Sequence, residues 1–176
     1  MRDLANQSKI VEFMRAFARN IASDVRVYFT GGATAVLMGW RDSTVDVDLR
    51  FDPELDELFR SIPRIKEELQ VNVELAAPSD FIPQLPGWET RSKYIGREGK
   101  VSYYHYDPYS QALSKIERGH RQDVLDVSSM LDTGLIDRAR LWELFKEIEP
   151  LLYKYPAIDP DSFSRAVLRV VDSDHK

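Results

Sequence analysis

Apolar residues recur along this chain at two spacings, and each spacing predicts one kind of element. Helical spacing of three to four residues covers 7–22 and 55–69, and Pro63 is expected to kink or split the second helix. β-Branched or alternating runs, with glycine and proline between them, predict the other elements of the first part of the chain. These are strands over 25–30, 45–51 and 71–76, a short helix over 32–38, an irregular loop over 78–87, and a hairpin of 91–97 with 100–106.

From residue 107 onward the pattern predicts helices alone, and capping residues mark their starts. Asp107-Pro108 and Asp159-Pro160 each combine an N-cap with proline at the first helical position, and Asp137 is a further N-cap. The expected helices cover 108–118, 122–131, 138–149 and 160–171. The fold class is therefore α/β (α+β), with a mixed-sheet core over 1–106 and a helical extension over 107–176. No linker-like composition separates these parts, so we expect them to pack as one structural unit.

Composition narrows the class of protein further. The chain has 176 residues, which fits one domain, and it contains no cysteine. Disulfides and thiolate metal sites are thereby excluded, and a reducing cytoplasm is the simplest location. No apolar run approaches the roughly 20 residues of a membrane span, and the N-terminus lacks the apolar stretch of a signal peptide. A net charge of −5 argues against a broadly basic surface for nucleic acid, although a local basic stretch lies between Arg91 and Arg121.

The residues most informative about function lie on one predicted turn and two predicted strands. The pair Gly31-Gly32 ends a strand and opens a helix, which is a suitable place for a phosphate group. Asp46 and Asp48 alternate with apolar residues, so both carboxylates leave the same face of their strand. Like charges so placed repel each other unless a cation lies between them. Glu74 alternates with apolar neighbours in the same way on a later strand. The pattern points to a phosphate-bearing ligand and Mg²⁺.

In this order, the glycine pair, the two aspartates and the strand with Glu74 resemble the polymerase-β-like nucleotidyltransferase superfamily. The resemblance implies three carboxylates on two strands, two divalent metal ions (Mg²⁺ or Mn²⁺), and a glycine turn that seats a nucleoside triphosphate. By that resemblance Asp46 and Asp48 are catalytic metal ligands, and Glu74 is the third catalytic acid. Gly31 and Gly32 bind the nucleotide. Thr44 matches the small hydroxyl residue common two positions before the first aspartate.

A second set of residues lies in the expected helices 108–118 and 122–131. Lys115, with the run Arg121-Gln122-Asp123 and Asp126, is similar to the Lys…Arg-x-Asp pattern of the bacterial AbiEii-type subgroup of this superfamily. That subgroup includes toxins of toxin–antitoxin pairs. The resemblance implies that Lys115 contacts nucleotide phosphates. It also implies that Asp123 orients a basic group or the attacking hydroxyl.

Each of these residues also has a plainer interpretation. The two strand aspartates could be solvated acids at a strand edge, and Glu74 an exposed acid or a partner for an arginine. The glycine pair could form a tight turn that binds no ligand. Lys115, Asp123 and Asp126 could lie on a solvated helix face. For the remaining candidates the sequence favours a hydrogen-bonded sheet histidine at His105 and a loop plug made by Trp88 and Arg91. It leaves Arg41 and Arg50 open between binding phosphate and neutralising the acidic strand.

The function that these residues predict is a metal-dependent nucleotidyltransferase, which moves a nucleoside monophosphate from a triphosphate to an acceptor hydroxyl and releases pyrophosphate. Candidate acceptors are tRNA and a protein. The alternatives are a toxin–antitoxin component with a cognate antitoxin, a degenerate module that binds nucleotide or partner without turnover, and an interaction module that works through its helices. No partnership with a membrane is expected.

Overall fold

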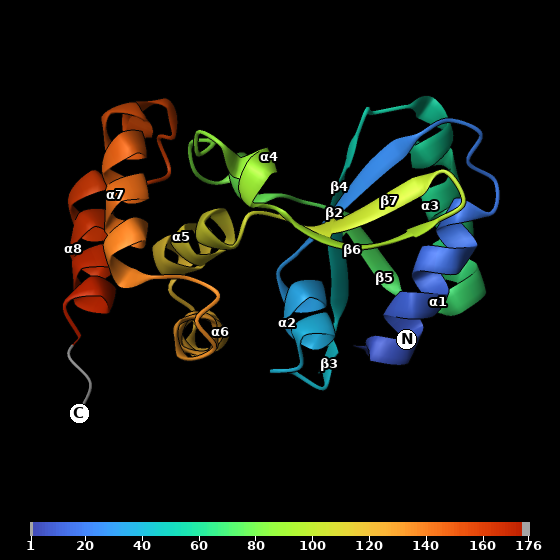
Figure 1. Ribbon diagram of the computed structural model, residues 1–176, viewed down its shortest axis with the longest axis horizontal. Coiled ribbons are helices and arrows are strands. Elements are labelled where there is room, and N and C mark those ends of the chain that lie inside the picture. Colours follow the sequence, from blue (N-terminus) through green and yellow to red (C-terminus); the bar gives the residue numbers. More distant parts are fainter. Residues whose placement is uncertain (1, 174–176) are drawn as a thin grey trace. The chain divides into compact units, whose positions relative to one another are not determined.

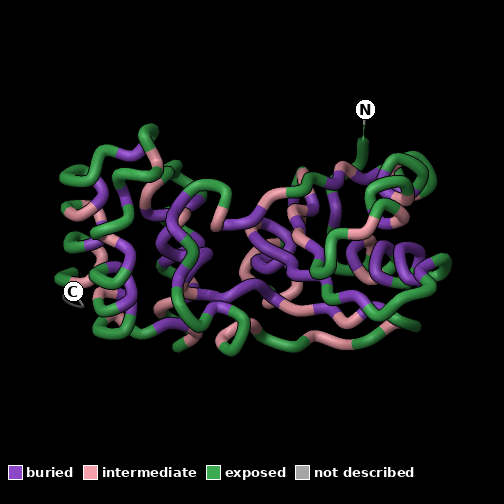
Figure 2. Tube along the Cα trace, turned by 90° about the horizontal axis from the view of Figure 1, so that it is seen from above, coloured by how far each residue is buried: buried purple, intermediate pink, exposed green. Residues whose placement is uncertain are grey.

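The computed structural model describes residues 2–173 and divides the chain into two compact units. The first unit comprises Met1–Ala77 and Ser92–Tyr106, and the second comprises Pro78–Arg91 and Asp107–Lys176. The loop that begins at Pro78 therefore belongs with the C-terminal helices, although it lies between two strands of the first unit in the sequence. Buried residues fill the interior of each unit, and exposed residues lie on its outside (Figure 2).

A five-stranded mixed sheet, in the order β5-β4-β2-β7-β6, forms the centre of the first unit (Figure 1). Strands β4 and β5 are parallel, as are β2 and β7, whereas β2–β4 and β6–β7 are antiparallel. The strands are β2 (Val25–Thr30), β4 (Asp46–Asp52), β5 (Asn72–Leu75), β6 (Lys93–Glu98) and β7 (Val101–His105). The expected mixed α/β class is confirmed, as are the strands and the hairpin. A second, two-stranded sheet of β1 (Ala5–Asn6) and β3 (Ser43–Thr44) was not expected.

One face of the five-stranded sheet is covered by α1 (Gln7–Ala18) and α3 (Asp56–Leu69). The ring centroids of Phe17 and Phe51 lie 5.9 Å apart, and those of Phe59 and Phe51 lie 5.2 Å apart. On β4, the odd-numbered residues are buried against these helices and the even-numbered residues are half-buried or exposed. Strand alternation therefore directs the aspartates of β4 to the opposite, polar face of the sheet.

Two helices of the first unit differ from expectation. Helix α1 ends at Ala18 rather than at residue 22. Helix α3 continues through Pro63, so the expected split is wrong. Pro63 is exposed while Ile62 and Ile65 are buried, so the helix is anchored to the core on both sides of the proline and the lost hydrogen bond lies toward water. The remaining helix of this unit, α2 (Gly32–Met38), has its expected bounds.

The second unit is helical throughout its regular elements (Figure 1). It contains η1 (Pro78–Asp80), α4 (Trp88–Arg91), α5 (Pro108–Arg118), α6 (Arg121–Asp132), α7 (Arg138–Ile148), η2 (Glu149–Lys154) and α8 (Pro160–Val171). Asp107 caps α5 by accepting from the Tyr109 amide at 3.1 Å, and Asp137 caps α7 by accepting from the Arg140 amide at 2.9 Å. Within residues 2–173, no helix combines the length and apolar character that crossing a bilayer requires.

The loop that starts at Pro78 is tied to α5 by a two-point ion pair. Arg91 donates to both carboxylate oxygens of Asp107, from Nε at 3.1 Å and from a terminal nitrogen at 2.8 Å. Asp107 is fully buried, and Trp88 is buried as well. These contacts support the interpretation of Trp88 and Arg91 as residues that pack the loop down, in preference to residues that stack on a base.

Candidate active site

The three candidate acids lie on one face of the first unit's sheet. Strands β4 and β5 are parallel and in a register that places Asn72 beside Asp46 and Glu74 beside Asp48. Residues two apart on a strand share a face, so all four side chains leave the same side. Asp46 and Asp48 are half-buried, and Glu74 is exposed. Neighbouring strands thus present three carboxylates toward the polar face.

Asn72 connects two of these acids and is the residue that the sequence did not single out. Its amide nitrogen donates to Asp46 Oδ1 at 2.5 Å and to Glu74 Oε1 at 3.3 Å. Its position two residues before Glu74, on an alternating strand, was the available signal that it shares the face. One amide therefore holds one oxygen of each acid.

The donor set of this face fits a hard divalent cation in kind, because carboxylate oxygens are the ligands that Mg²⁺ and Mn²⁺ prefer. Among residues 2–173, however, no group of three or more histidine, cysteine, aspartate or glutamate side chains is arranged as a ready metal site. The amide of Asn72 takes part of the acids' hydrogen-bonding capacity instead.

The glycine turn lies directly against the second aspartate and a threonine. Gly31 has a φ of +61°, and a Cβ on it would be 2.9 Å from Asp48 Oδ2. A Cβ on Gly32 would be 2.0 Å from Thr44 Oγ1, a distance that no side chain could occupy. Thr44 in turn donates its hydroxyl proton to the carbonyl of Asp46 at 3.0 Å. The absence of side chains on the two glycines therefore brings backbone, hydroxyl and carboxylate together at one end of β4.

Lys115 and Asp123 belong to the second unit, where they take part in a buried ionic cluster. The Lys115 ammonium lies 2.7 Å from Asp126 Oδ2 and 3.7 Å from Asp123 Oδ1. Arg118 donates to both oxygens of Asp123, at 2.8 and 2.6 Å. Lys115 is only 6% exposed and both acids are buried as well, so the solvated-face interpretation of these three residues is wrong.

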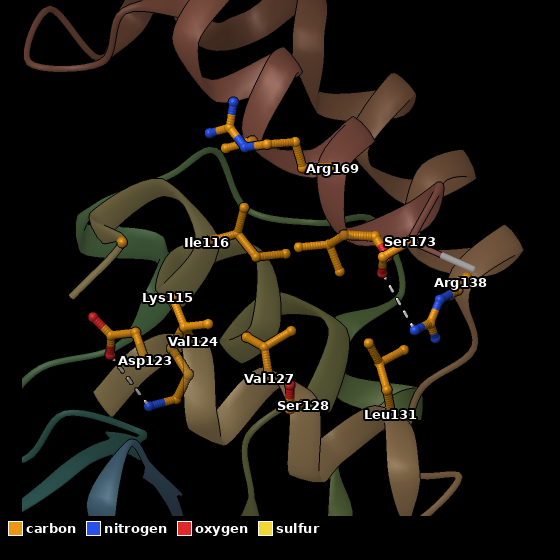
Figure 3. Close-up of a pocket in the computed structure, with 13 residues that line it drawn as sticks. Lys115, Ile116, Asp123, Val124, Val127, Ser128, Leu131, Arg138, Arg169 and Ser173 are labelled. Atoms are coloured by element: carbon orange, nitrogen blue, oxygen red, sulfur yellow. Dashed lines mark hydrogen bonds and ion pairs between the residues drawn. The ribbon is translucent and has the colours of Figure 1, made fainter. Parts of the chain in front are cut away.

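The electrostatics of Asp123 follow from these contacts. Burial alone would raise the pKa of its carboxyl, but the hydrogen bonds and charge of Arg118, assisted by Lys115, outweigh burial and lower the pKa below its usual value. Lys115 and Asp123 lie together at one end of a cavity of about 380 Å³ (Figure 3). The walls of this cavity are mostly apolar, from Ile116, Val127 and Leu131 among others.

His105 behaves as the sequence favoured. It is buried, and its Nδ1 lies 3.0 Å from Thr34 Oγ1. The same Thr34 hydroxyl also lies 3.3 Å from the Phe29 carbonyl, so ring, hydroxyl and backbone are joined in one buried network. Burial lowers the pKa of His105 to about 4, so the ring is neutral near pH 7. It is a hydrogen-bonded sheet histidine.

The acids on β4 and β5, the glycine turn and the mixed sheet all belong to the first unit. Residues 7–161 match the family model described as "Nucleotidyltransferase of unknown function (DUF6036)". This match spans most of the chain, so the chain belongs to that family and is a nucleotidyltransferase. No curated protein and no solved structure gives a significant match. The finer resemblance to the AbiEii-type subgroup stays a hypothesis.

Proposed function

We propose that the protein transfers a nucleoside monophosphate from a nucleoside triphosphate to an acceptor hydroxyl in a metal-dependent reaction. One observation carries this proposal: the Gly31-Gly32 turn lies against Asp48 and Thr44, beside a sheet face that also bears Asp46 and Glu74. A phosphate group placed over the turn would lie next to acids whose chemistry suits a divalent cation.

Each candidate residue of the first unit has a role in the proposed reaction. Asp46 and Asp48 hold Mg²⁺ or Mn²⁺, and the glycine turn with Thr44 seats the triphosphate. When bound, the metal ions stabilise negative charge on the entering and leaving oxygens. The acceptor oxygen forms a bond to the α-phosphorus while the bond from that phosphorus to the bridging oxygen breaks, and pyrophosphate leaves. The proton of the acceptor hydroxyl passes to Glu74 or another carboxylate. Positioning and charge stabilisation supply most of the rate in such chemistry.

The resemblance also gives Lys115 and Asp123 a part in nucleotide binding. In the structure the Lys115 ammonium is held by Asp126 and Asp123. Contact with a phosphate would require this ammonium to exchange or share its carboxylate partners. For that reason the proposed function rests on the first unit.

The competing function is a module that binds a nucleotide or a partner without turnover. The observation in its favour is the Asn72 amide, which donates hydrogen bonds to Asp46 and Glu74. Among residues 2–173, no three metal-binding side chains form a ready cation site. If the protein belongs to a toxin–antitoxin pair, the acceptor would be tRNA or a protein, and a cognate antitoxin would be an additional partner. It would leave the transfer chemistry as described.

The experiment is a transfer assay with each nucleoside triphosphate labelled at the α-phosphate, with Mg²⁺ or Mn²⁺, and with bulk tRNA or cell lysate as the source of acceptor. We expect metal-dependent label transfer together with pyrophosphate release, both lost in Asp48→Asn. Metal-dependent nucleotide binding without transfer would favour the non-catalytic module. A folded wild-type protein with neither activity would contradict the proposal.

A further inference from the structure

The turn that follows helix α2 returns the chain toward the start of that helix. The carbonyl of Ala35 accepts three consecutive backbone amides, from Gly39 and Trp40 at 3.1 Å and from Arg41 at 3.3 Å. Gly39, at a φ of +91°, takes the left-handed conformation that such a helix end requires. The side chain of Arg41, two residues after Gly39, extends back to the start of this short helix.

Arg41 reaches the glycine turn at which α2 begins. One terminal nitrogen of its guanidinium lies 3.2 Å from the position that a Cβ on Gly32 would occupy. The Thr44 hydroxyl lies 2.0 Å from the same position, and Asp48 lies against the preceding glycine. A guanidinium, a hydroxyl and a carboxylate thus surround one glycine pair, and all of them belong to the first unit.

We propose that Arg41 binds the β- or γ-phosphate of the nucleoside triphosphate. This inference rests on the proposed function and assigns the cationic side of its nucleotide site. A guanidinium presents two parallel N–H donors that match the geometry of phosphate oxygens, and such charge-assisted pairs are among the stronger polar contacts in proteins. As pyrophosphate leaves, charge builds up on the same oxygens, so the contact also favours the transition state.

Arg41 is better placed for this role than Lys115. Lys115 belongs to the second unit, whereas the glycine turn and the acids belong to the first. Arg41 is half-buried and already lies over the turn. Because it shares a compact unit with the glycines and the acids, its contact with the phosphates needs no contribution from the second unit.

The alternative role for Arg41 is to neutralise the acidic strand, and the two roles predict different results. A residue that only neutralises Asp46 and Asp48 affects the binding of nucleoside mono- and triphosphates alike. A residue that binds the β- or γ-phosphate affects the triphosphate alone. The ratio of triphosphate affinity to monophosphate affinity therefore distinguishes a phosphate contact from a structural role.

The experiment is calorimetric titration of the folded protein with each nucleoside triphosphate and the matching monophosphate, with Ca²⁺ in place of Mg²⁺ to slow turnover. For Arg41→Ala we expect triphosphate affinity to fall roughly ten- to a hundredfold, which is the factor that a lost charge-assisted hydrogen bond gives. Monophosphate affinity should change little. Arg41→Lys should restore part of the loss, because it keeps the charge but not the planar fork.

Arg50→Ala is the matched control, since Arg50 is also a half-buried arginine of the first unit, and it lies on β4 two residues beyond Asp48, on the side away from the turn. It should leave the affinity ratio unchanged. Arg41→Gln, checked by thermal melting, serves if the alanine variant does not fold. If the folded Arg41→Ala or Arg41→Gln variant binds both the triphosphate and the monophosphate with wild-type affinity, the role of Arg41 is overturned. The proposed function would still stand. A wild-type protein that binds no nucleotide would overturn both.

Discussion

The two units contain clusters of charged side chains that are organised in opposite ways. In the second unit, Asp123 and Asp126 are buried and each has a cation within hydrogen-bonding distance. On the sheet face of the first unit, Asp46 and Glu74 are more accessible and share the neutral amide of Asn72. Buried acids must be compensated inside the protein, whereas accessible acids can be approached by a cation from solution. The proposed chemistry therefore uses the acids of the first unit, and we expect a structural role for the ionic cluster of the second.

The largest expected effect comes from removing the cation of the buried cluster. Lys115→Met keeps the length of the side chain but leaves Asp126 without its ammonium partner at 2.7 Å. Breaking a buried ion pair in this way typically costs about 3–5 kcal/mol of stability. Chemical denaturation of the wild type and the variant measures the loss.

Two further measurements show whether the cluster is only structural. The double variant Lys115→Met/Asp126→Asn removes the stranded charge and should recover part of the stability. Nucleotide affinity, measured on the folded protein, should stay the same in both variants. A drop in nucleotide affinity without a drop in stability would contradict a purely structural role for this cluster. It would support nucleotide binding by Lys115.

The next effect concerns the acids of the first unit. Asp48→Asn preserves the size of the side chain and removes one negative charge from the proposed metal site. Since metal-stabilised charge is worth several kcal/mol in the transition state, transfer should fall about a hundredfold or more. The melting temperature without metal should hold or rise, because repulsion between Asp46 and Asp48 is relieved. Activity retained by this variant would contradict a metal-dependent reaction at Asp48.

Local patterns predicted much of the fold, and their failures have physical reasons. Strand β2 and helix α2 have their expected bounds, because a β-branched run ends at the pair Gly31-Gly32 and a further glycine, Gly39, closes the helix. The two residues of β1 pair with β3 almost forty residues later, and so short a strand has no periodicity of its own to detect. In α3, the break expected at Pro63 was overridden by burial of isoleucines on both sides of it.

The candidate site shows the same division between local and distant information. Alternation alone placed Asp46 and Asp48 on one face of their strand. The contact of Asn72 with Asp46 depends on the register between β4 and β5, which no local pattern specifies. Lys115 was assigned to the polar side of its helix, but α6 packs against α5 and brings Asp123 and Asp126 over that side. Its burial could be recognised only from the tertiary structure.

Lowering the pH should remove the stabilising contributions of His105, in the first unit, and Asp123, in the second, over different pH ranges. The pKa of His105 falls from 6.5 to about 4 on burial, so the unfolded chain binds a proton there that the folded first unit rejects. Stability should therefore decrease as the pH falls from about 6.5 to about 4, by about 3 kcal/mol from this residue. Asp123, whose pKa is lowered, keeps its contribution over that range and loses it only in stronger acid. His105→Gln should flatten the profile between pH 6.5 and 4, and an unchanged profile would contradict this assignment.

The smallest expected effect tests the amide on the sheet face. Asn72→Ala removes the hydrogen bonds to Asp46 and Glu74, which should cost about 1 kcal/mol, since both acids are partly accessible to water. Asn72→Asp keeps the shape but adds a fourth carboxylate, so its loss without metal should be larger. If these acids form a cation site, Mg²⁺ or Mn²⁺ should raise the melting temperature of Asn72→Asp by more than it raises that of the wild type, because the cation compensates the added charge. An equal loss with and without metal would mean that Asn72 acts only in packing, and the contrast between the two clusters would then rest on burial alone.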